Sequence, residues 1–245
     1  MSEEEPQNLS KYMRLLGQLM YLIYSRPDIL PSVSYAATKS KNSTEKDYQD
    51  LLQIVSYLRQ TPDYGLTLYP KRKGDDDSLN LIAYMDAAYM SHSDASSHTG
   101  YCISLGPTQP RSFFMSKSQK QKCMSTSSTH AEIRALYELT INIIYLTTLF
   151  KEIKRPIELP VVIFEDNQAT VDLVTDSTTR ITKSKHYLML IHTIREQVEL
   201  GLIEVRKVDG ESNITNVLTK IISDTEFFES IVKIMGLENR VSRNG

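Results

Sequence analysis

The stretch that most constrains the fold is the apolar run Leu79–Tyr89, with the sequence LNLIAYMDAAY. Its side chains alternate as in a β-strand, and both faces are largely apolar, as expected for a strand covered on both sides. The run closes on Asp86. A carboxylate at the end of a buried strand is costly unless it is hydrogen-bonded, paired or bound to a metal. Asp86 is therefore a candidate functional residue.

Composition sets broad limits on what the chain can be. Its 245 residues are 40% hydrophobic and 24% charged, which suits one large soluble domain or two small ones. The formal net charge of -2 excludes nucleic-acid binding through bulk positive charge, so such contacts need local basic patches. The two cysteines, Cys102 and Cys123, have no metal-site spacing and are too few for a disulfide framework. They indicate a reducing, intracellular setting.

We expect no membrane partner. The chain opens with acidic residues and not with a basic and then apolar leader. The most apolar run, 141–150, contains Asn142 and two threonines and is too short to span a bilayer.

The first 75 residues predict a small helical region. Apolar residues at helical spacing begin after Ser10, a candidate N-cap, and Pro27 interrupts them because proline disfavours helix at the preceding residue. A second helix is expected over 28–41, and a third after Thr44, which can cap it. A short strand is expected over 64–69. The charged, glycine-containing stretch 71–77 is the best domain boundary.

The rest of the chain predicts an α/β domain. Three strands joined by short turns indicate an antiparallel meander, and a long helix follows them. The full order, β-β-β-α-β-α-α-β-α, predicts a mixed five-stranded sheet with helices on its faces. The expected strands are 79–86, 98–105, 111–116, 161–164 and 202–208; the expected helices are one that follows 125–129 and ends near 153, then 168–174, 185–200 and a last one from 213.

Three carboxylates fall at matching places in this pattern. Asp86 ends the first strand, Asp166 ends the fourth, and Glu132 lies one turn into the long helix. If the first and fourth strands pair in parallel, Asp86 and Asp166 emerge side by side at the carboxyl edge of the sheet, where open α/β sheets place their sites. Glu132 can reach the same point from the helix. The chain then brings three acids to one place.

Such a cluster suggests a metal site. Clustered carboxylates repel one another unless a cation is present, and hard oxygen ligands suit Mg²⁺ or Mn²⁺. Two ions would allow phosphodiester cleavage, one activating water and the other stabilising the leaving oxygen. Each acid also has a simpler interpretation, because an Asp after a strand is often a turn residue or a helix cap, and a Glu on a helix is usually solvated. Three acids in this order favour the metal site.

Short motifs along nearly the whole chain resemble those at the end of copia-class retrotransposon polyproteins. The resemblance covers the tail of reverse transcriptase and the ribonuclease H domain that follows it. Each motif alone is weak, and the complete series in order is highly specific. The motifs are Tyr12–Leu22 (YMRLLGQLMYL), Ser25–Ile29 (SRPDI), Asp86–Tyr89 (DAAY), Thr99–Tyr101 (TGY), Ser127–Glu132 (SSTHAE), Asp166–Ala169 (DNQA), Lys183–His186 (KSKH), Ile194–Glu196 (IRE) and Val217–Lys220 (VLTK).

The resemblance implies a ribonuclease H-like fold and a nuclease that uses two Mg²⁺ or Mn²⁺ ions to cut the RNA strand of RNA–DNA hybrids. It implies that Asp86, Glu132 and Asp166 are catalytic metal ligands. The family's fourth acid precedes the VLTK motif, where this chain has Asn216. An amide oxygen can also bind a hard cation, but it lacks the charge, so the affinity for metal should be lower.

The sequence departs from the family pattern at other places as well. Leu188–Leu190 replaces an expected Asp and Arg, and Ala95-Ser96 lacks the basic pair often found before the TGY motif. The polymerase carboxylates would lie upstream of Tyr12 and are absent from this chain, so we expect no polymerase activity.

The resemblance also implies domains, partners and a location. We expect a thumb- or connection-like reverse transcriptase tail over 1–75, a ribonuclease H-like domain over 76–222 and a helical tail over 223–245. The expected partners are an RNA–DNA hybrid and the polymerase part of a reverse transcriptase. The expected location is intracellular, in cytoplasmic virus-like particles, with the nucleus as a second compartment. Candidate contacts to the hybrid are Lys117, Lys120, Lys122, Arg180, Lys183, Lys185 and His186, although a solvated charged surface is as good an interpretation.

Two other functions remain open. The chain could be a non-catalytic remnant that keeps the fold and at most weak nucleic-acid binding; Asn216 and the missing polymerase core favour this. A host-adopted interaction module is the third possibility, for which the sequence has no specific feature.

Overall fold

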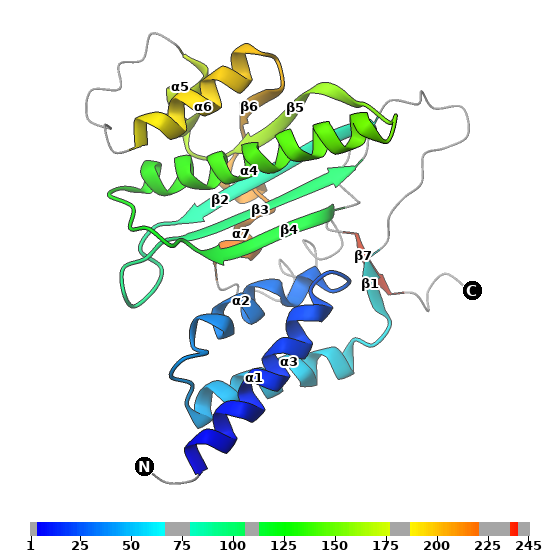
Figure 1. Ribbon diagram of the computed structural model, residues 1–245, viewed down its shortest axis with the longest axis vertical. Helices are drawn as coiled ribbons and strands as arrows, with labels where there is room; N and C mark the ends of the chain where they lie inside the picture. Colours follow the sequence, from blue (N-terminus) through cyan, green and yellow to red (C-terminus); the bar gives the residue numbers. More distant parts are fainter. Residues whose placement is uncertain (1–3, 67–78, 106–112, 177–186, 221–235, 240–245) are drawn as a thin grey trace.

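Figure 1 shows a computed structural model of the chain, which describes residues 4–66, 79–105, 113–176, 187–220 and 236–239. The described part has a helical region at the N-terminus and a five-stranded sheet with helices on both faces. The helical region consists of α1 (Glu4–Leu22), the short 3₁₀ helix η1 (Pro27–Ile29), α2 (Leu30–Thr38) and α3 (Glu45–Gln60). The break at Pro27 and the start after Thr44 are as predicted. The predicted start of the first helix is wrong, because α1 begins at Glu4 and Ser10 lies within it.

Local chemistry explains the ends of these helices. Thr44 Oγ1 accepts a hydrogen bond from Asp47 N, and the Asp47 carboxylate accepts one from Thr44 N, so both orphan amides are satisfied in a capping box. At the break, the buried Arg26 guanidinium lies 2.7 Å from the Asp28 carboxylate. Tyr57 Oη of α3 donates to the same carboxylate at 2.8 Å. This polar contact fixes the turn at Pro27 to α3.

The sheet has the strand order β4-β3-β2-β5-β6. β2 pairs antiparallel with β3 and β3 with β4, whereas β2 pairs parallel with β5 and β5 with β6. The predicted mixed five-stranded sheet, with the first and fourth predicted strands parallel, is therefore confirmed. The strands are β2 (Leu79–Ala88), β3 (His98–Leu105), β4 (Phe113–Lys120), β5 (Ile157–Glu165) and β6 (Ile203–Lys207).

Two strand ends differ from the sequence prediction. β2 does not end at Asp86, because Ala87 and Ala88 still pair with Thr99 and His98 of β3. β4 continues to Lys120, since its polar residues pair along β3 as far as His98. In both cases the pairing partner, and not the hydrophobic pattern, sets the length of the strand.

One face of the sheet is covered by three helices, α4 (Ser128–Glu152), α5 (Gln168–Thr175) and α6 (Leu188–Glu199) (Figure 1). Inward-facing side chains of β2 and β5 pack with apolar residues of all three helices in the main core. By length and composition alone α4 could cross a membrane, which is weak evidence, because core helices pass the same test. Ten of its residues are buried, and among them is the carboxylate Glu132.

The opposite face is covered by α7 (Asn216–Thr219) and by the helical region. Leu30 of α2 packs in one cluster with Cys102 of β3, Phe113 of β4 and Leu218 of α7. The helical region also has a core of its own, built from Tyr12, Leu16, Leu19, Ile29, Val33, Ala36 and Leu51. Its apolar residues are thus divided between an internal core and the sheet.

A second, two-stranded sheet joins the segment that follows α3 to the last described residues. β1 (Tyr64–Leu66) pairs antiparallel with β7 (Leu237–Asn239). Of the tail over 223–245, for which helix was expected, the structure describes 236–239, and these residues carry β7.

The polar end of this face has a specific seat for α7. Asp86, Gly100 and Ser118 are direct cross-strand partners on β2, β3 and β4, so their side chains share one face. Ser118 Oγ donates to Leu218 O at 2.7 Å, and Thr219 Oγ1 donates to Asp86 Oδ2. Gly100 lies between these anchors, where a Cβ atom would be 2.5 Å from Thr219 Cγ2 and 2.9 Å from Leu218 Cβ. Glycine at this position lets α7 lie directly on the sheet.

Two histidines support this seat. His98 Nε2 lies 2.8 Å from Ser118 Oγ, and His92 Nε2 lies 3.0 Å from His98 Nδ1. Because Ser118 donates its proton to Leu218 O, we assign the Nε2–H tautomer to both rings, each donating along the chain. Burial lowers the pKa of His98 to about 4, which keeps its Nδ1 free to accept. His92 in turn stacks on Tyr35 of α2, linking the seat to the helical region.

We predict that Gly100→Ala destabilises the protein by about 1–3 kcal/mol, because the added methyl group overpacks a site with no free space. Urea unfolding followed by circular dichroism measures this. Gly17→Ala in α1 is the matched control: no atom lies within 4 Å of the added Cβ, and the change should stabilise the helix by up to about 1 kcal/mol. Equal midpoints for native and Gly100→Ala proteins would contradict the proposed seat.

Candidate metal centre

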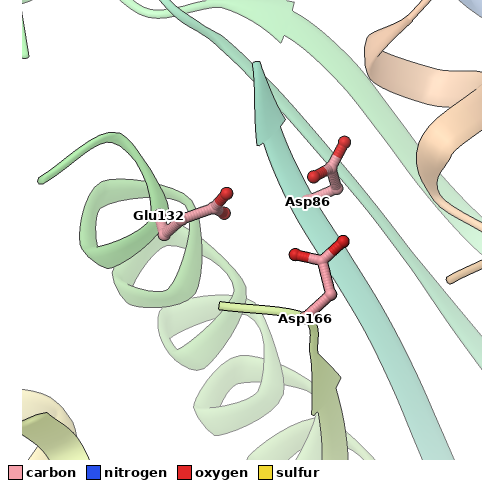
Figure 2. Close-up of side chains that lie close together, drawn as sticks. All are labelled: Asp86, Glu132 and Asp166. Atoms are coloured by element: carbon pink, nitrogen blue, oxygen red, sulfur yellow. The ribbon is translucent and has the colours of Figure 1, made fainter. Parts of the chain in front are cut away.

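Three carboxylates from separate elements meet at the carboxyl end of the parallel strands. Asp86 comes from β2, Asp166 follows the last residue of β5, and Glu132 lies in the first two turns of α4. Each residue offers one ligand oxygen, and these oxygens all lie within 4.8 Å of one another. Figure 2 shows the three side chains converging on a common point. The predicted cluster of three acids is present in the structure.

The backbone explains why they meet. In the parallel ladder Tyr84 is level with Phe164, so the same register brings Asp86 level with Asp166. The start of α4 is held by Ser127, whose Oγ accepts a hydrogen bond from His130 N at 3.1 Å. This cap fixes the start of α4, and Glu132, one turn further along the helix, points toward the sheet (Figure 2).

The site is largely shielded from water. Asp86 and Glu132 are 2% and 4% exposed, and Asp166 is half-buried. Burial raises the pKa of Glu132 well above its usual range, and the charges of Glu165, Asp86 and Asp166 raise it further. Burial and the charge of Asp86 likewise raise the pKa of Asp166. The carboxylates therefore destabilise one another's charged forms.

A fourth buried acid, Glu165, was not expected as part of the site. It is the last residue of β5 and is fully buried, on the face of the sheet that α4 covers. Its Oε1 accepts a hydrogen bond from Asn167 N at 2.8 Å, whereas its Oε2 has no partner. Burial, together with the charges of Asp166 and Asp86, raises the pKa of Glu165 to about 8. A glutamate at the inward position of an otherwise apolar strand was the sequence signal for it.

Other polar groups offset part of the negative charge. Thr219 Oγ1 donates to Asp86 Oδ2, and Lys220 Nζ lies 3.4 Å from the same oxygen. Asn213 donates from Nδ2 to Met85 O at 2.8 Å, and its side chain also hydrogen-bonds to Asp166, which lowers the pKa of that acid. Thr219 and Lys220 belong to the VLTK motif, but no local pattern in the sequence indicates these contacts with Asp86.

The predicted fourth ligand, Asn216, lies at the start of α7 and makes other contacts. Its Nδ2 donates to Gly210 O at 2.6 Å, and its Oδ1 accepts a hydrogen bond from Lys220 Nζ. The described hydrogen bonds of its side chain therefore go to a backbone carbonyl and an ammonium group, and none goes to the three acids. Whether Asn216 can ligate a cation stays a prediction.

The predicted hybrid contacts are only partly within the described residues. Lys117 pairs with Glu138 of α4 at 2.7 Å, and Lys120 pairs with Asp94 in the turn between β2 and β3. Lys122 is exposed just after β4. Arg180, Lys183, Lys185 and His186 lie outside the described residues. Nucleic-acid contact by any of them remains a prediction.

A cleft of about 800 Å³ lies beside the site, between α2, α3 and α7. Tyr35, His92 and Lys220 are among its lining residues, and the three carboxylates are not. Lys220 thus stands between the cleft and the acids.

The donor set fits a hard divalent cation. It consists of carboxylate oxygens, the ligands that Mg²⁺ and Mn²⁺ prefer. Glu132 Oε2 and Glu165 Oε2 are buried without a hydrogen-bond partner, and a buried charged oxygen without a partner is strongly unfavourable. A cation held by Asp86, Glu132 and Asp166 would relieve the repulsion that raises the pKa values.

Comparison with known proteins finds similar sequences in retrotransposon polyproteins. The chain is 32% identical over 226 residues to the retrovirus-related Pol polyprotein from transposon RE1 of Arabidopsis thaliana, a match that covers 92% of this chain and 15% of the relative. It is 31% identical over 219 residues to the corresponding polyprotein from transposon RE2 of the same plant, covering 89% of this chain and 14% of the relative. Over about nine-tenths of its length, the chain is similar to part of these retrotransposon Pol polyproteins.

The match covers one part of these long polyproteins. The chain spans about 15% of the length of these polyproteins, and no model of a protein family matches it. Among solved structures, LC11-RNase H1 from a compost metagenome is 13% identical, with a TM-score of 0.43, covering 62% of this chain and 98% of that protein. The assignment of the α/β fold class therefore rests on the observed strand order of the sheet.

We predict a pH dependence of stability that depends on Glu165. An unfolded glutamate loses its proton near pH 4.5, whereas folded Glu165 keeps it until about pH 8, so the folded state loses stability as the pH rises between these values. In cation-free buffer, Glu165→Gln should flatten this decline by up to about 1.4 kcal/mol per pH unit.

Urea unfolding at pH 5, 6, 7 and 8 measures the effect. Glu158→Gln, at an exposed position of the same strand, is the control and should leave the decline unchanged. If the free energy of unfolding declines equally with pH in the native and Glu165→Gln proteins, Glu165 is not the cause of the decline.

Proposed function

We propose that this chain is the ribonuclease H part of a retrotransposon Pol polyprotein, together with the tail of its reverse transcriptase, and that it hydrolyses the RNA strand of RNA–DNA hybrids with the help of divalent cations. The observation that carries the proposal is the convergence of Asp86, Glu132 and Asp166 within 4.8 Å at the carboxyl edge of β2 and β5. Similarity to Pol polyproteins over about nine-tenths of the chain supports it.

We further propose the domain limits expected from the sequence, 1–75, 76–222 and 223–245, with the location in virus-like particles and the nucleus. The polymerase part of the same polyprotein would be the natural neighbour of the helical region, because the chain spans only about 15% of its relatives.

The residues of the site would have different roles in this reaction. Asp86, Glu132 and Asp166 would hold a divalent cation, which when bound supplies Lewis-acid activation of water and neutralises charge on the phosphodiester. Thr219 holds one oxygen of Asp86 by hydrogen bonding, and Asn213 does the same for Asp166. These bonds keep the carboxylates in place despite their repulsion. The shielding of Asp86 and Glu132 from water strengthens their hold on a cation.

A non-catalytic remnant is the second candidate, and one observation favours it. Asn216 carries no charge and uses both its amide oxygen and its nitrogen in contacts with Lys220 and Gly210. If phosphodiester hydrolysis needs a fourth charged ligand at that position, the chain would keep the fold and lose the reaction.

Cleavage of a labelled RNA–DNA hybrid tests the proposal. We expect cleavage by the native chain in Mg²⁺ or Mn²⁺. Asp86→Asn should slow it by at least about a hundredfold, because metal activation contributes several kcal/mol and each 1.4 kcal/mol is a factor of ten. Asp172→Asn, at an exposed carboxylate of α5, is the matched control and should cleave like the native chain.

The same assay separates the two candidates. If the native chain does not cleave the hybrid but Asn216→Asp does, the site is intact except for the missing charge at residue 216. Silence from both proteins, each folded by circular dichroism, would establish the remnant and refute the enzyme.

A further inference from the structure

A buried amide ties the start of α4 to the sheet. Gln121 follows directly after β4 and is buried. Its Nε2 donates to Ala131 O of α4 at 3.0 Å and to Thr99 Oγ1 of β3 at 3.1 Å. Both hydrogens of the amide nitrogen are therefore used, one on the helix and one on the sheet.

The orientation of this amide is fixed by its neighbours. Ala131 O can only accept a hydrogen bond, so the amide nitrogen, and not the amide oxygen, must face the helix. The amide oxygen accepts a bond from Ser125 Oγ at 2.9 Å. The backbone N–H of Gln121 donates to Ser97 O at 2.8 Å. The backbone and the side chain of Gln121 are thus both held in one position.

The two ends of this bridge lie beside two of the acids. Ala131 directly precedes Glu132 in α4. Thr99 is the cross-strand partner of Ala87, the residue after Asp86. Figure 2 shows the side chains of Glu132 and Asp86 converging from α4 and β2. The bridging amide therefore connects the backbone next to one candidate ligand with the strand that pairs alongside the other.

A similar bridge lies several turns further along α4. Asn142 donates from Nδ2 to Glu138 O of the helix at 2.8 Å and to Tyr101 Oη of β3 at 2.9 Å. As at Gln121, one amide nitrogen is shared between a carbonyl of α4 and a side-chain oxygen of β3. The two bridges differ in place, because only the bridge at Gln121 reaches the turn that carries Glu132.

A cation site needs its ligands held together before the ion binds. Asp86 and Asp166 belong to neighbouring parallel strands, and the ladder between β2 and β5 sets their distance. Glu132 comes from a helix, and its distance from the strands depends on how α4 packs on the sheet. Apolar packing is non-directional, whereas a hydrogen bond fixes both a distance and a direction. A hydrogen bond from the sheet to the start of α4 therefore limits where Glu132 can lie.

We propose that Gln121 is a positioning residue of the metal centre: its amide fixes the first turns of α4 against β3 and thereby holds Glu132 at ligand distance from Asp86. The inference rests on the proposed function only in taking the three acids as cation ligands. Gln121 acts through Ala131 and needs no contact with the ion.

Binding of Mn²⁺ tests the proposal without any measurement of cleavage. Gln121→Met removes the hydrogen bonds of the side chain and keeps its length. The free ion is followed by its electron paramagnetic resonance signal during titration. We expect a dissociation constant about tenfold higher than that of the native chain, because residues that orient metal ligands have effects of this size. Gln121→Asn, one methylene too short to reach both partners, replaces Gln121→Met if the latter does not fold.

Asn142→Leu is the matched control, because it removes the same kind of bridge at a place remote from the acids. It should lower the urea midpoint about as much as Gln121→Met does and leave the affinity for Mn²⁺ unchanged. Equal Mn²⁺ affinity of the native chain and Gln121→Met would overturn the inference. An equal loss of affinity in Gln121→Met and Asn142→Leu would also overturn it, because Gln121 would then act on the fold as a whole.

Amide hydrogen exchange in cation-free buffer separates this inference from the proposed function. Gln121→Met should speed exchange in the first two turns of α4 by about fivefold, and Asn142→Leu should leave those turns unchanged. If the native chain binds no Mn²⁺, the metal-dependent function is refuted, and equal exchange in the native chain and Gln121→Met would then overturn the positioning role as well. The expected differences in Mn²⁺ affinity without hybrid cleavage would support the inference and reject only the cleavage.

Discussion

Repulsion between buried carboxylates is the interaction on which the functional end of this molecule depends. Asp86, Glu132 and Glu165 are buried within reach of one another, and Asp166 stands at their edge. Burial and mutual repulsion raise the pKa of Glu132, Glu165 and Asp166, so the fold holds these acids against their electrostatic preference. A protein can keep such a cluster when protons or a cation neutralise it, and the contacts of Thr219, Asn213 and Lys220 offset only part of the charge.

Two packing features bring the groups of the site together. Parallel pairing of β2 with β5 sets Asp86 level with Asp166, and α4 crosses that edge with Glu132 in its capped first turns. On the opposite face, α7 rests on Gly100 between the side chains of Ser118 and Asp86. The helical region closes this face through Leu30, so it shares a core with the sheet. The position of Lys220 therefore depends on contacts on the face away from α4.

Much of this could be predicted from the sequence, because its signals are local. Alternating and helical hydrophobic patterns gave the element order, and the three acids followed from strand ends and one helical turn. The predicted end of β2 at Asp86 was wrong, because Ala87 and Ala88 continue to pair with β3. Glu165 was missed although its place in the alternation of an apolar strand was a signal, because the pattern alone does not show that this end of β5 lies beside the acid of α4.

The roles of Gly100 and of Lys220 could not be predicted for a similar reason. Residues 100 and 218–220 are distant in sequence, and their contact depends on how α7 lies on the sheet. The docking of α2 on β4 and α7 likewise arises from long-range packing, which no local pattern specifies.

If a divalent cation relieves the repulsion among the buried acids, it must raise the free energy of unfolding, and measuring that free energy with and without the ion is the most direct test. Saturating Mn²⁺ at a hundred times its dissociation constant should stabilise the native chain by about 2.7 kcal/mol. Glu132→Gln, which removes one of the charges, should be at least as stable as the native chain in cation-free buffer and gain much less from Mn²⁺. A native chain whose stability does not change with Mn²⁺ would contradict the account.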